Sequence, residues 1–268
     1  MADDSTTRWA LVLGASSGFG EACSLHLARA GWNVFGVHLD RKSTQPNVDR
    51  IVGEIRAAGR RAEFFNVNAA DDAKRAEVVA AIEKTCGGEP RESRVSVLLH
   101  SLAFGTLKPF FAQPRENAIA KAQIEMTLDV MANSLVYWTQ DLFFAGLLAP
   151  SARVFAMTSA GDHIVWPAYG AVSAAKSALE SYVRQLAVEL APHGVAVNAL
   201  RAGVTDTPAL RKIPDNDSMV QVALRKNPAH RLTRPEDVAS AIVALSQPCT
   251  YWINGNVINV DGGEAASG

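Results

Sequence analysis

Three residues that could do acid–base chemistry, Ser159, Tyr169 and Lys176, occur close together in the sequence. A phenol can donate its proton, or a strong hydrogen bond, to an oxygen that gains negative charge, and a nearby ammonium makes that donation easier at neutral pH. A hydroxyl such as that of Ser159 could hold the same oxygen. The alternative is structural: a half-buried aromatic, a solvated helix lysine and a strand-end hydroxyl that satisfies main-chain groups.

The segment from Tyr169 to Leu190 has the apolar period of an amphipathic helix. From Leu179 onward, apolar residues recur at i, i+3, i+4 and i+7, and Pro192 with Gly194 ends the pattern. Residues seven apart on a helix differ by about 20° in direction, so Tyr169 and Lys176 point the same way if the helix has begun by Tyr169. The two side chains could then serve one pocket.

A second group of residues, near the N-terminus, is suited to holding a phosphate. The apolar run from Trp9 to Leu13 precedes GASSGFG, and a helical stretch from Glu21 to Ala30 follows it. A strand, a glycine turn and a helix in this order form an anion site, because main-chain N–H groups and the helix N-terminus face the phosphate. The glycine pattern is G-x-x-x-G-x-G, in the context that such a motif requires. We predict dinucleotide binding here, with a purely structural turn as the alternative.

Strands and helices alternate along the rest of the chain. Further strands are predicted at 33–39, 62–67, 95–100, 153–158, 195–200 and 256–260, and further helices at 46–58, 71–86, 118–144 and 169–190. A capping box from Thr233 to Glu236 opens a last helix that ends at Leu245. This alternation predicts an α/β fold with a doubly wound parallel seven-stranded sheet of Rossmann type, in a single domain over residues 1–268.

In such sheets, ligands bind beyond the carboxyl ends of the strands, near the point where strand order reverses. The carboxyl ends of predicted strands carry five such segments: Gly14 to Gly20, Asn66, His100 to Ala103, Ser159 and Arg201 to Thr207. We therefore expect these five segments to gather at one rim of the sheet, where they would form the ligand site.

Composition excludes several classes of function. The chain has 268 residues, 48% hydrophobic and 20% charged, with a net charge of -1, so it offers no basic field for nucleic acid or an anionic membrane. No apolar run is long enough to span a membrane. Six histidines and three separated cysteines without CxxC spacing predict neither a metal site nor a disulfide framework. The acidic, polar N-terminus is unlike a signal peptide, and we expect a cytoplasmic protein with reduced cysteines.

Nearly the whole chain resembles the short-chain dehydrogenase/reductase family. LGASSGFG is similar to the family's TGxxxGxG, and Ser159 and Lys176 hold its serine and lysine positions. The other similar segments are Asn66-Val67, which matches its adenine-contacting pair, Asn198 with Ala202-Gly203 and Thr207, which resemble NxxxPGxxxT, and VDGG at 260–263.

The departures from the family pattern point to one branch of it. Most members carry the tyrosine four residues before the lysine, where this chain has Val172, whereas Tyr169 lies seven before. This Y-x6-K spacing and the segment HSLAFG resemble the enoyl-acyl-carrier-protein reductases, and AVSAAKSALESYVRQLAVEL is most similar to their divergent, NADPH-using members. The family's helix asparagine has no counterpart: Met131 falls in its register, and Asn133 lies about 200° round the helix.

The resemblance implies that a hydride passes from a nicotinamide to the β-carbon of an enoyl thioester, in fatty acid biosynthesis, with acyl carrier protein as a candidate partner. Tyr169 would stabilise the negative charge on the thioester oxygen, Lys176 would hold the nicotinamide ribose, and Ser159 would assist. One alternative is a carbonyl reductase or alcohol dehydrogenase of the same fold, in which the tyrosine protonates a ketone oxygen. The other is a protein that binds a dinucleotide without turnover.

NADPH is the cofactor that we expect, with NADH as the alternative. The family's acidic position falls on His38, Asp40 lies two residues further, and Arg41 could bind a 2′-phosphate bidentately. The cofactor-binding residues implied by the resemblance are Gly14, Ser16, Ser17, Gly18, Phe19, Gly20, His38, Arg41, Asn66, Val67, His100, Ser101, Leu102, Lys176, Gly203, Thr205 and Thr207.

Two further expectations concern organisation beyond the site. The stretch 208–230, with prolines and acidic residues among apolar ones, is predicted to be a lid over the substrate. The two long helices predicted at 118–144 and 169–190 carry more apolar surface than one sheet face needs. In the family such helices commonly pack against their copies, and we therefore expect a homotetramer.

Overall fold

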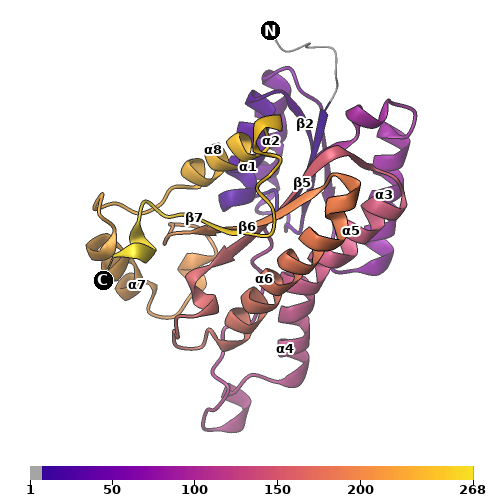
Figure 1. Cartoon of the computed structure of the whole chain (residues 1–268). Helices are drawn as coiled ribbons and strands as arrows, with labels where there is room; N and C mark the ends of the chain where they lie inside the picture. The colour runs from indigo at the N-terminus through magenta and orange to yellow at the C-terminus, as the bar shows by residue number, and fades with distance from the viewer. Residues whose placement is uncertain (1–7, 268) are drawn as a thin grey trace.

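The computed structural model describes residues 8–267 of the chain, and its centre is one sheet of parallel strands (Figure 1). The strands lie in the order β3-β2-β1-β4-β5-β6-β7, which confirms the predicted seven-stranded parallel sheet. Their bounds are β1 Arg8–Leu13, β2 Trp32–His38, β3 Ala62–Asn66, β4 Val95–His100, β5 Leu148–Ser159, β6 Ala196–Ala202 and β7 Val257–Val260. The order reverses between β1 and β4, so ligands are expected near the ends of these two strands.

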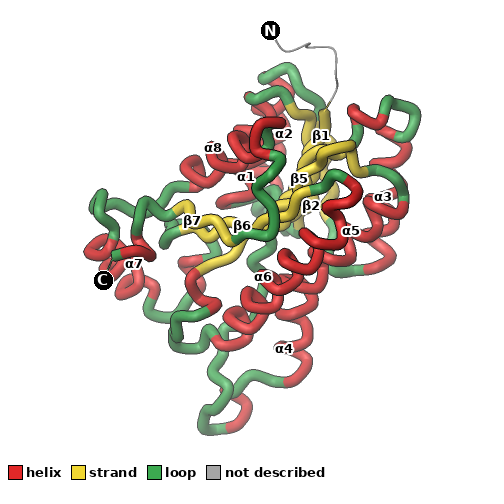
Figure 2. Tube along the Cα trace, in the orientation of Figure 1, coloured by secondary structure: helices red, strands yellow, loops and turns green. Residues whose placement is uncertain are grey.

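Helices cover both faces of the sheet (Figure 2). On one face lie α1 (Gly18–Arg29), α2 (Gln45–Ala57) and α8 (Pro235–Leu245); on the other lie α3 (Asp72–Cys86), α4 (Lys121–Leu128), α5 (Ser134–Phe144) and α6 (Gly170–Leu190). Alternate residues of each strand point to opposite faces, so Ala10 and Val12 enter one core while Leu11 and Leu13 enter the other. Because both faces are buried, the central strands are mostly apolar, which is why they can be identified in the sequence.

The segment predicted as one helix over 118–144 differs from that expectation in two ways. It begins at Lys121, after a short 3-10 turn at Arg115–Asn117, and a π-helical turn at Asp129–Asn133 separates α4 from α5. A π turn inserts one extra residue and changes the direction in which the following side chains point. The face that α5 presents to the sheet therefore cannot be obtained by counting from α4.

Two other predicted boundaries are wrong. Strand β5 begins at Leu148, earlier than predicted, because the exposed Pro150 and Ser151 interrupt the apolar run in the sequence. The last helix is capped one residue later than predicted: the Asp237 carboxylate, rather than that of Glu236, accepts the main-chain N–H of Arg234 at 2.8 Å. Thr233, expected at the cap, is buried instead.

The predicted lid contains regular structure of its own. A 3-10 turn at Leu210–Lys212 and helix α7 (Asn216–Lys226) lie within 208–230.

Over residues 8–267, no helix is long and apolar enough to cross a membrane. In that same range, no group of three or more histidine, cysteine, aspartate or glutamate side chains could hold a metal ion.

Candidate active site

The glycine turn after β1 has the close main-chain contacts that only glycine allows. Gly14 has φ +86°, and a Cβ there would lie 2.5 Å from the carbonyl oxygen of Ser101, at the end of β4. A Cβ at Gly20 would lie 2.0 Å from the Gly14 oxygen. The Gly14 N–H also donates to Val37 O at 2.8 Å, and the Ser101 N–H donates to Leu13 O at 2.9 Å. The ends of β1, β2 and β4 are thus tied together at the point where strand order reverses.

A cavity of about 270 Å³ opens over this turn. It is lined by segments that follow five strands, β1 to β4 and β6. The lining includes these predicted cofactor-binding residues: Gly14, Ser16, Ser17, Gly18, Phe19, His38, Val67, Ser101, Leu102 and Thr207. The glycine main chain, the start of α1 and an apolar wall suit the pyrophosphate and adenosine parts of a dinucleotide. Pro208, Ala209 and Lys212 line the same cavity, so the start of the predicted lid lies next to it.

The end of β2 holds a carboxylate next to the glycine turn. Asp40 is hydrogen-bonded by the side chains of Ser16 and Thr44, and by His38 Nδ1 at 3.0 Å. Burial acts to raise the pKa of the Asp40 carboxyl, but these hydrogen bonds outweigh it and the pKa is lowered. Asp40 is therefore ionised at neutral pH, beside the glycine turn.

Two other predicted adenosine contacts lie outside the cavity lining. The Asn66 amide binds the main chain of Asp40, with its Nδ2 donating to Asp40 O at 3.0 Å and its Oδ1 accepting from Asp40 N at 2.9 Å. Its role in this structure is to fix the loop after β2. Arg41 is exposed and does not line the cavity.

His100 is enclosed within the core, with none of its surface exposed, so its side chain is not available to a ligand. Its Nε2 lies 2.9 Å from Ser134 Oγ, and the Ser134 hydroxyl donates to Val130 O at 2.8 Å. Because Ser134 uses its proton on Val130, Nε2 must carry the hydrogen of a neutral ring. Burial, followed by the charge of Lys176, lowers the pKa of His100 to about 3. His100 is therefore a packing residue, contrary to its predicted cofactor contact.

The proposed catalytic tyrosine and serine do meet. Tyr169 is the residue before the first turn of α6, and its hydroxyl lies 3.4 Å from Ser159 Oγ at the end of β5. The absence of a side chain at Gly161 makes room for the ring, because a Cβ there would lie 2.3 Å from a Tyr169 ring carbon. Burial raises the pKa of the Tyr169 phenol and Ser159 offsets only part of that effect. The phenol therefore stays protonated at neutral pH and can act as a donor.

Lys176 approaches the same strand end from a different point. Its side chain is buried, and Nζ donates to Met157 O at 2.8 Å, two residues before Ser159. Burial lowers the pKa of the Lys176 ammonium to about 8, although the Glu180 carboxylate acts to raise it. The predicted common direction of Tyr169 and Lys176 required a helix that includes Tyr169. Helix α6 begins one residue later, at Gly170. The two side chains share the end of β5, each with its own hydrogen-bond partner.

An ion pair lies one turn beyond Lys176 on α6. Glu180 Oε1 accepts from Thr158 Oγ1 at 2.7 Å, and Arg201 donates to both Glu180 oxygens at 3.0 and 3.2 Å. These contacts join β5, β6 and α6 just below the rim. A carboxylate held in this way supplies a fixed negative charge near Lys176, and sequence reasoning missed it because its members lie far apart in the chain.

The position that carries the tyrosine in most of the family is apolar here. Val172 is buried, and its methyl group lies close to Gly105, where a Cβ would be 3.0 Å away. Asn133, which lies outside the register of the family's helix asparagine, accepts a hydrogen bond from the Tyr182 hydroxyl at 3.0 Å. Tyr182 is half-buried and packs against the core, with its hydroxyl bound to this partner.

The loop after β6 is fixed by its own threonines. Thr205 Oγ1 donates to Gly203 O at 2.9 Å, and Thr207 Oγ1 accepts from the Leu210 N–H at 3.2 Å. Glycine is required at Gly203, because a Cβ would lie 2.5 Å from Thr233 Oγ1. Thr207 lines the cavity, whereas Gly203 and Thr205 do not.

Exposed apolar side chains surround the start of α6. Phe110 packs against Gly170, where a Cβ would lie 2.5 Å from its ring, and is still 51% exposed. Ile164 and Val165, on the loop between β5 and α6, are 51% and 95% exposed. Trp166 Nε1 in the same loop donates to Pro214 O at 3.0 Å, which connects this loop to the predicted lid. The surface next to Tyr169 therefore suits an apolar ligand.

Comparison with known proteins identifies the family of the chain. A family model described as Enoyl-(Acyl carrier protein) reductase matches residues 14–264. The chain is 27% identical over 259 residues to 1-cyclohexenylcarbonyl-CoA reductase of Streptomyces collinus, covering 94% of this chain and 85% of that one. It is 29% identical over 262 residues to 3-oxoacyl-[acyl-carrier-protein] reductase of Synechocystis sp. (96% and 97%) and 28% over 264 to cyclohexanol dehydrogenase of Rhodococcus sp. (95% and 94%).

Among solved structures, enoyl-[acyl-carrier-protein] reductase (NADH) from Aquifex aeolicus VF5 superimposes with a TM-score of 0.82, at 21% identity and 99% coverage of both chains. At this identity the likeness concerns the fold. The family model spans almost the whole chain. The chain belongs to the short-chain dehydrogenase/reductase superfamily, in the family described as Enoyl-(Acyl carrier protein) reductase, and its members use a nicotinamide dinucleotide.

Proposed function

We propose that this protein reduces the 2,3 double bond of an enoyl thioester, with NADPH as the electron donor. The observation that carries the proposal is the Tyr169 phenol. It is held protonated by burial and lies 3.4 Å from Ser159 Oγ. The exposed ring of Phe110 packs against the next residue, Gly170, and the loop that leads to Tyr169 carries the exposed Val165. A protonated donor next to an apolar surface suits an acyl chain whose thioester oxygen must be stabilised as it gains charge.

The roles of the chain's residues follow from their contacts. A bound reduced nicotinamide would supply the hydride for the β-carbon, and solvent would supply the proton for the α-carbon. Tyr169 would donate a hydrogen bond to the thioester oxygen, and Ser159 would orient that phenol. Lys176, with a pKa of about 8, remains mostly charged at pH 7 and would favour the developing negative charge. Glu180 would position Lys176 through its fixed carboxylate.

Dinucleotide binding is proposed at the glycine turn and the cavity above it. Gly14 to Phe19 would face the pyrophosphate, Val67 the adenine, and Ser101 with Leu102 the nicotinamide side. For the 2′-phosphate of NADPH we propose Arg41, whose exposed guanidinium can reach a ligand at the rim. NADH is the second candidate, and the ionised Asp40 beside Ser16 favours it, since a carboxylate there repels a 2′-phosphate and accepts from a 2′-hydroxyl.

Kinetics with paired variants would decide between the two cofactors. If NADPH is used, Arg41→Ala should lower kcat/KM for NADPH at least tenfold and leave that for NADH within twofold. Asp40→Asn should change the ratio in the opposite direction. A wild-type enzyme that prefers NADH and is indifferent to Arg41→Ala would contradict the NADPH proposal without affecting the proposed reaction.

A substrate panel tests the reaction itself. Oxidation of the reduced dinucleotide is followed with crotonyl and longer 2-enoyl thioesters, on coenzyme A and on acyl carrier protein, in parallel with 3-oxoacyl thioesters and cyclic ketones. We expect kcat/KM for an enoyl thioester to exceed that for each ketone by at least tenfold. Faster turnover of the ketones would identify a carbonyl reductase, and dinucleotide binding without turnover of any compound would identify a binding protein.

A homotetramer is proposed from the exposed apolar residues of the two long helices. Phe144 at the end of α5 is 79% exposed and Val188 on α6 is 73% exposed. Exposed apolar residues of this size suit contact with copies of the same helices. Light scattering at micromolar concentration should give the mass of four chains, and the mass of one chain would exclude the proposal.

A further inference from the structure

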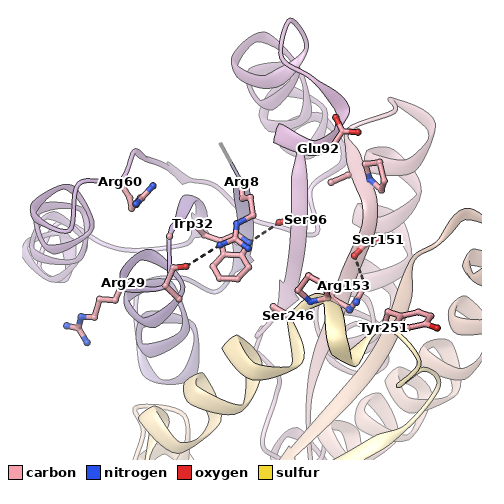
Figure 3. A pocket seen from close by; sticks show the side chains of 15 residues that line it. Arg8, Arg29, Trp32, Arg60, Glu92, Ser96, Ser151, Arg153, Ser246 and Tyr251 are labelled. Atoms are coloured by element: carbon pink, nitrogen blue, oxygen red, sulfur yellow. Dashed lines mark hydrogen bonds between the residues drawn. The ribbon is translucent and has the colours of Figure 1, made fainter. Parts of the chain in front are cut away.

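A second and larger cavity lies at the opposite edge of the sheet from the glycine turn (Figure 3). It has a volume of about 830 Å³ and is bounded by the amino ends of β1, β2, β4 and β5 together with the segment after α8. Its charged lining residues are four arginines, Arg8, Arg29, Arg60 and Arg153, and one glutamate, Glu92. Such a surplus of positive charge around one cavity is suited to an anion.

Arg8 is held flat against an aromatic ring at one wall. Its guanidinium carbon lies 3.9 Å from the centre of the Trp32 ring, and one of its nitrogens donates to Ala30 O at 3.3 Å. Trp32 is itself fixed, because its Nε1 donates to Ser96 Oγ at 2.9 Å. The cation–π contact and the single hydrogen bond orient the guanidinium and leave its other N–H groups for a ligand.

Arg153 lies at the facing wall, where it is 3% exposed. Its recorded hydrogen bonds go to two main-chain oxygens, Ser151 O at 2.5 Å and Ala152 O at 3.5 Å, and its Nε has no partner. Arg60 Nε is also buried without a partner. Between residues 8 and 267, no carboxylate forms a salt bridge with Arg8, Arg60 or Arg153, whereas Arg29 is paired with Glu54.

This arrangement is energetically unfavourable as it stands. A buried guanidinium without a counter-charge is costly, and like charges on neighbouring arginines add to that cost. Burial, with the charge of Arg60, lowers the pKa of Arg8, and burial lowers that of Arg153. The carbonyl oxygen of Ala30, at the end of α1, offsets only about half a charge for Arg8. An anion in the cavity would neutralise the remainder and complete the hydrogen bonds of the guanidinium groups.

We propose that this cavity, defined by Arg8, Arg60 and Arg153, is a binding site for a small molecule that carries a phosphate group, separate from the dinucleotide site. Arg8 and Arg153 face each other across it with orientations fixed by Trp32 and by the β5 main chain. Phosphate is the favoured anion because several guanidinium forks can bind its oxygens at once. The site is independent of the function proposed above.

Calorimetric titration of the full chain with inorganic phosphate, at constant ionic strength, tests the proposal. Wild type should bind one phosphate saturably at this cavity, and Arg8→Met and Arg60→Met should each weaken that binding at least tenfold. Arg61→Met is the matched control, because Arg61 is adjacent in sequence but pairs with Glu63 at 3.1 Å and does not line the cavity. It should change the affinity less than twofold.

Two further variants test whether the phosphate binds at the arginines rather than at the glycine turn, and whether Asp3 and Asp4 compete with it. Gly14→Ala alters the glycine turn, and the binding at the arginines should survive it. The sequence before Arg8 carries Asp3 and Asp4, whose carboxylates are anionic like the proposed ligand. The double variant Asp3→Asn with Asp4→Asn should therefore leave the affinity for phosphate unchanged or raise it. The proposal is overturned if phosphate binds to neither the wild type nor this double variant, or if Arg8→Met and Arg60→Met bind phosphate as well as the wild type does. The arginines would then serve only to bind the protein's own main chain. Because Arg8 and Arg60 are partly exposed, this test does not depend on the buried Arg153.

Discussion

Replacement of Lys176 by methionine should stabilise the folded protein at neutral pH while removing turnover. The Lys176 side chain is 5% exposed, and burial lowers its pKa from 10.5 to about 8. Since the folded-state pKa lies below the unfolded-state value, the unfolded chain holds this proton more tightly, and the charge opposes folding. The difference between the two pKa values corresponds to about 3 kcal/mol of lost stability at pH 7.

Methionine removes this penalty and costs one hydrogen bond. The bond from Nζ to Met157 O is worth about 1 kcal/mol, so the net gain should be about 2 kcal/mol at pH 7. Glu180 does not become a new unpaired charge, because Thr158 and Arg201 remain bound to it. Because the ammonium charge of Lys176 is lost, kcat should fall while the free energy of unfolding rises.

The pH dependence isolates the lysine from changes in packing. The penalty is complete below the folded-state pKa of about 8 and is lost as the pH rises through the unfolded-state value of 10.5, so wild-type stability should increase in that window. At about pH 9.5 the penalty should be about 1.5 kcal/mol, and the advantage of Lys176→Met should therefore shrink by about 2 kcal/mol. Other groups titrate alike in both proteins and cancel in the comparison.

Urea unfolding of wild type and Lys176→Met, at pH 7 and at about pH 9.5 without added dinucleotide, measures this change. Lys176→Leu packs differently but should show the same loss of advantage between the two pH values. A difference in stability that is the same at both pH values would refute the reasoning, because it would mean that the buried ammonium is not destabilised in the folded protein.

Three more predictions concern the rim. Tyr169→Phe should lower kcat on the preferred substrate by about a hundredfold or more, since one oxyanion donor is lost. The free energy of unfolding in urea should change by less than about 1 kcal/mol, because the hydrogen bond to Ser159 is long. An unchanged kcat would exclude Tyr169 from catalysis. Gly14→Ala should weaken dinucleotide binding at least tenfold in a fluorescence titration. Gly14 has a φ of +86°, and the new Cβ would lie 2.5 Å from the Ser101 carbonyl oxygen. An affinity equal to that of the wild type would mean that the turn does not hold the cofactor. Trp166→Phe removes the donor to Pro214 O and should raise KM for the acyl substrate several-fold more than it lowers kcat; equal effects on both would argue that 208–230 is not a substrate lid.

The fold could be predicted from the sequence because buried parallel strands are apolar on both faces and are separated by helices of clear period. The gathering of strand ends could also be predicted, since the carboxyl ends of parallel strands share one edge. Gly14, Ser101 and Thr207 do meet around one cavity, although they come from three distant segments. Tyr169 and Ser159 meet for the same reason, at the end of β5.

Side-chain directions could not be predicted in the same way. His100 follows a strand like a ligand-binding residue, yet its ring turns inward because Ser134 on α5 offers a partner there. Lys176 has the spacing of a rim residue, but its ammonium binds the main chain of Met157. The cavity at the amino edge has no sequence signal at all, because Arg8, Arg60 and Arg153 belong to separate segments and follow no motif.

The π turn at Asp129–Asn133 constrains the number of residues between α4 and α5, because side chains on both sides of it support the site. Before the turn, Thr127 Oγ1 accepts the main-chain N–H of Thr106 at 3.0 Å and supports the loop after β4; after the turn, Ser134 supports His100. Deleting one residue would restore a continuous α-helix but rotate one half against the other by about 100°. Thr127 and Ser134 could then no longer both face the sheet. A single-residue deletion here should therefore be tolerated far less than a substitution, and natural variation in this helix would have to preserve its phase.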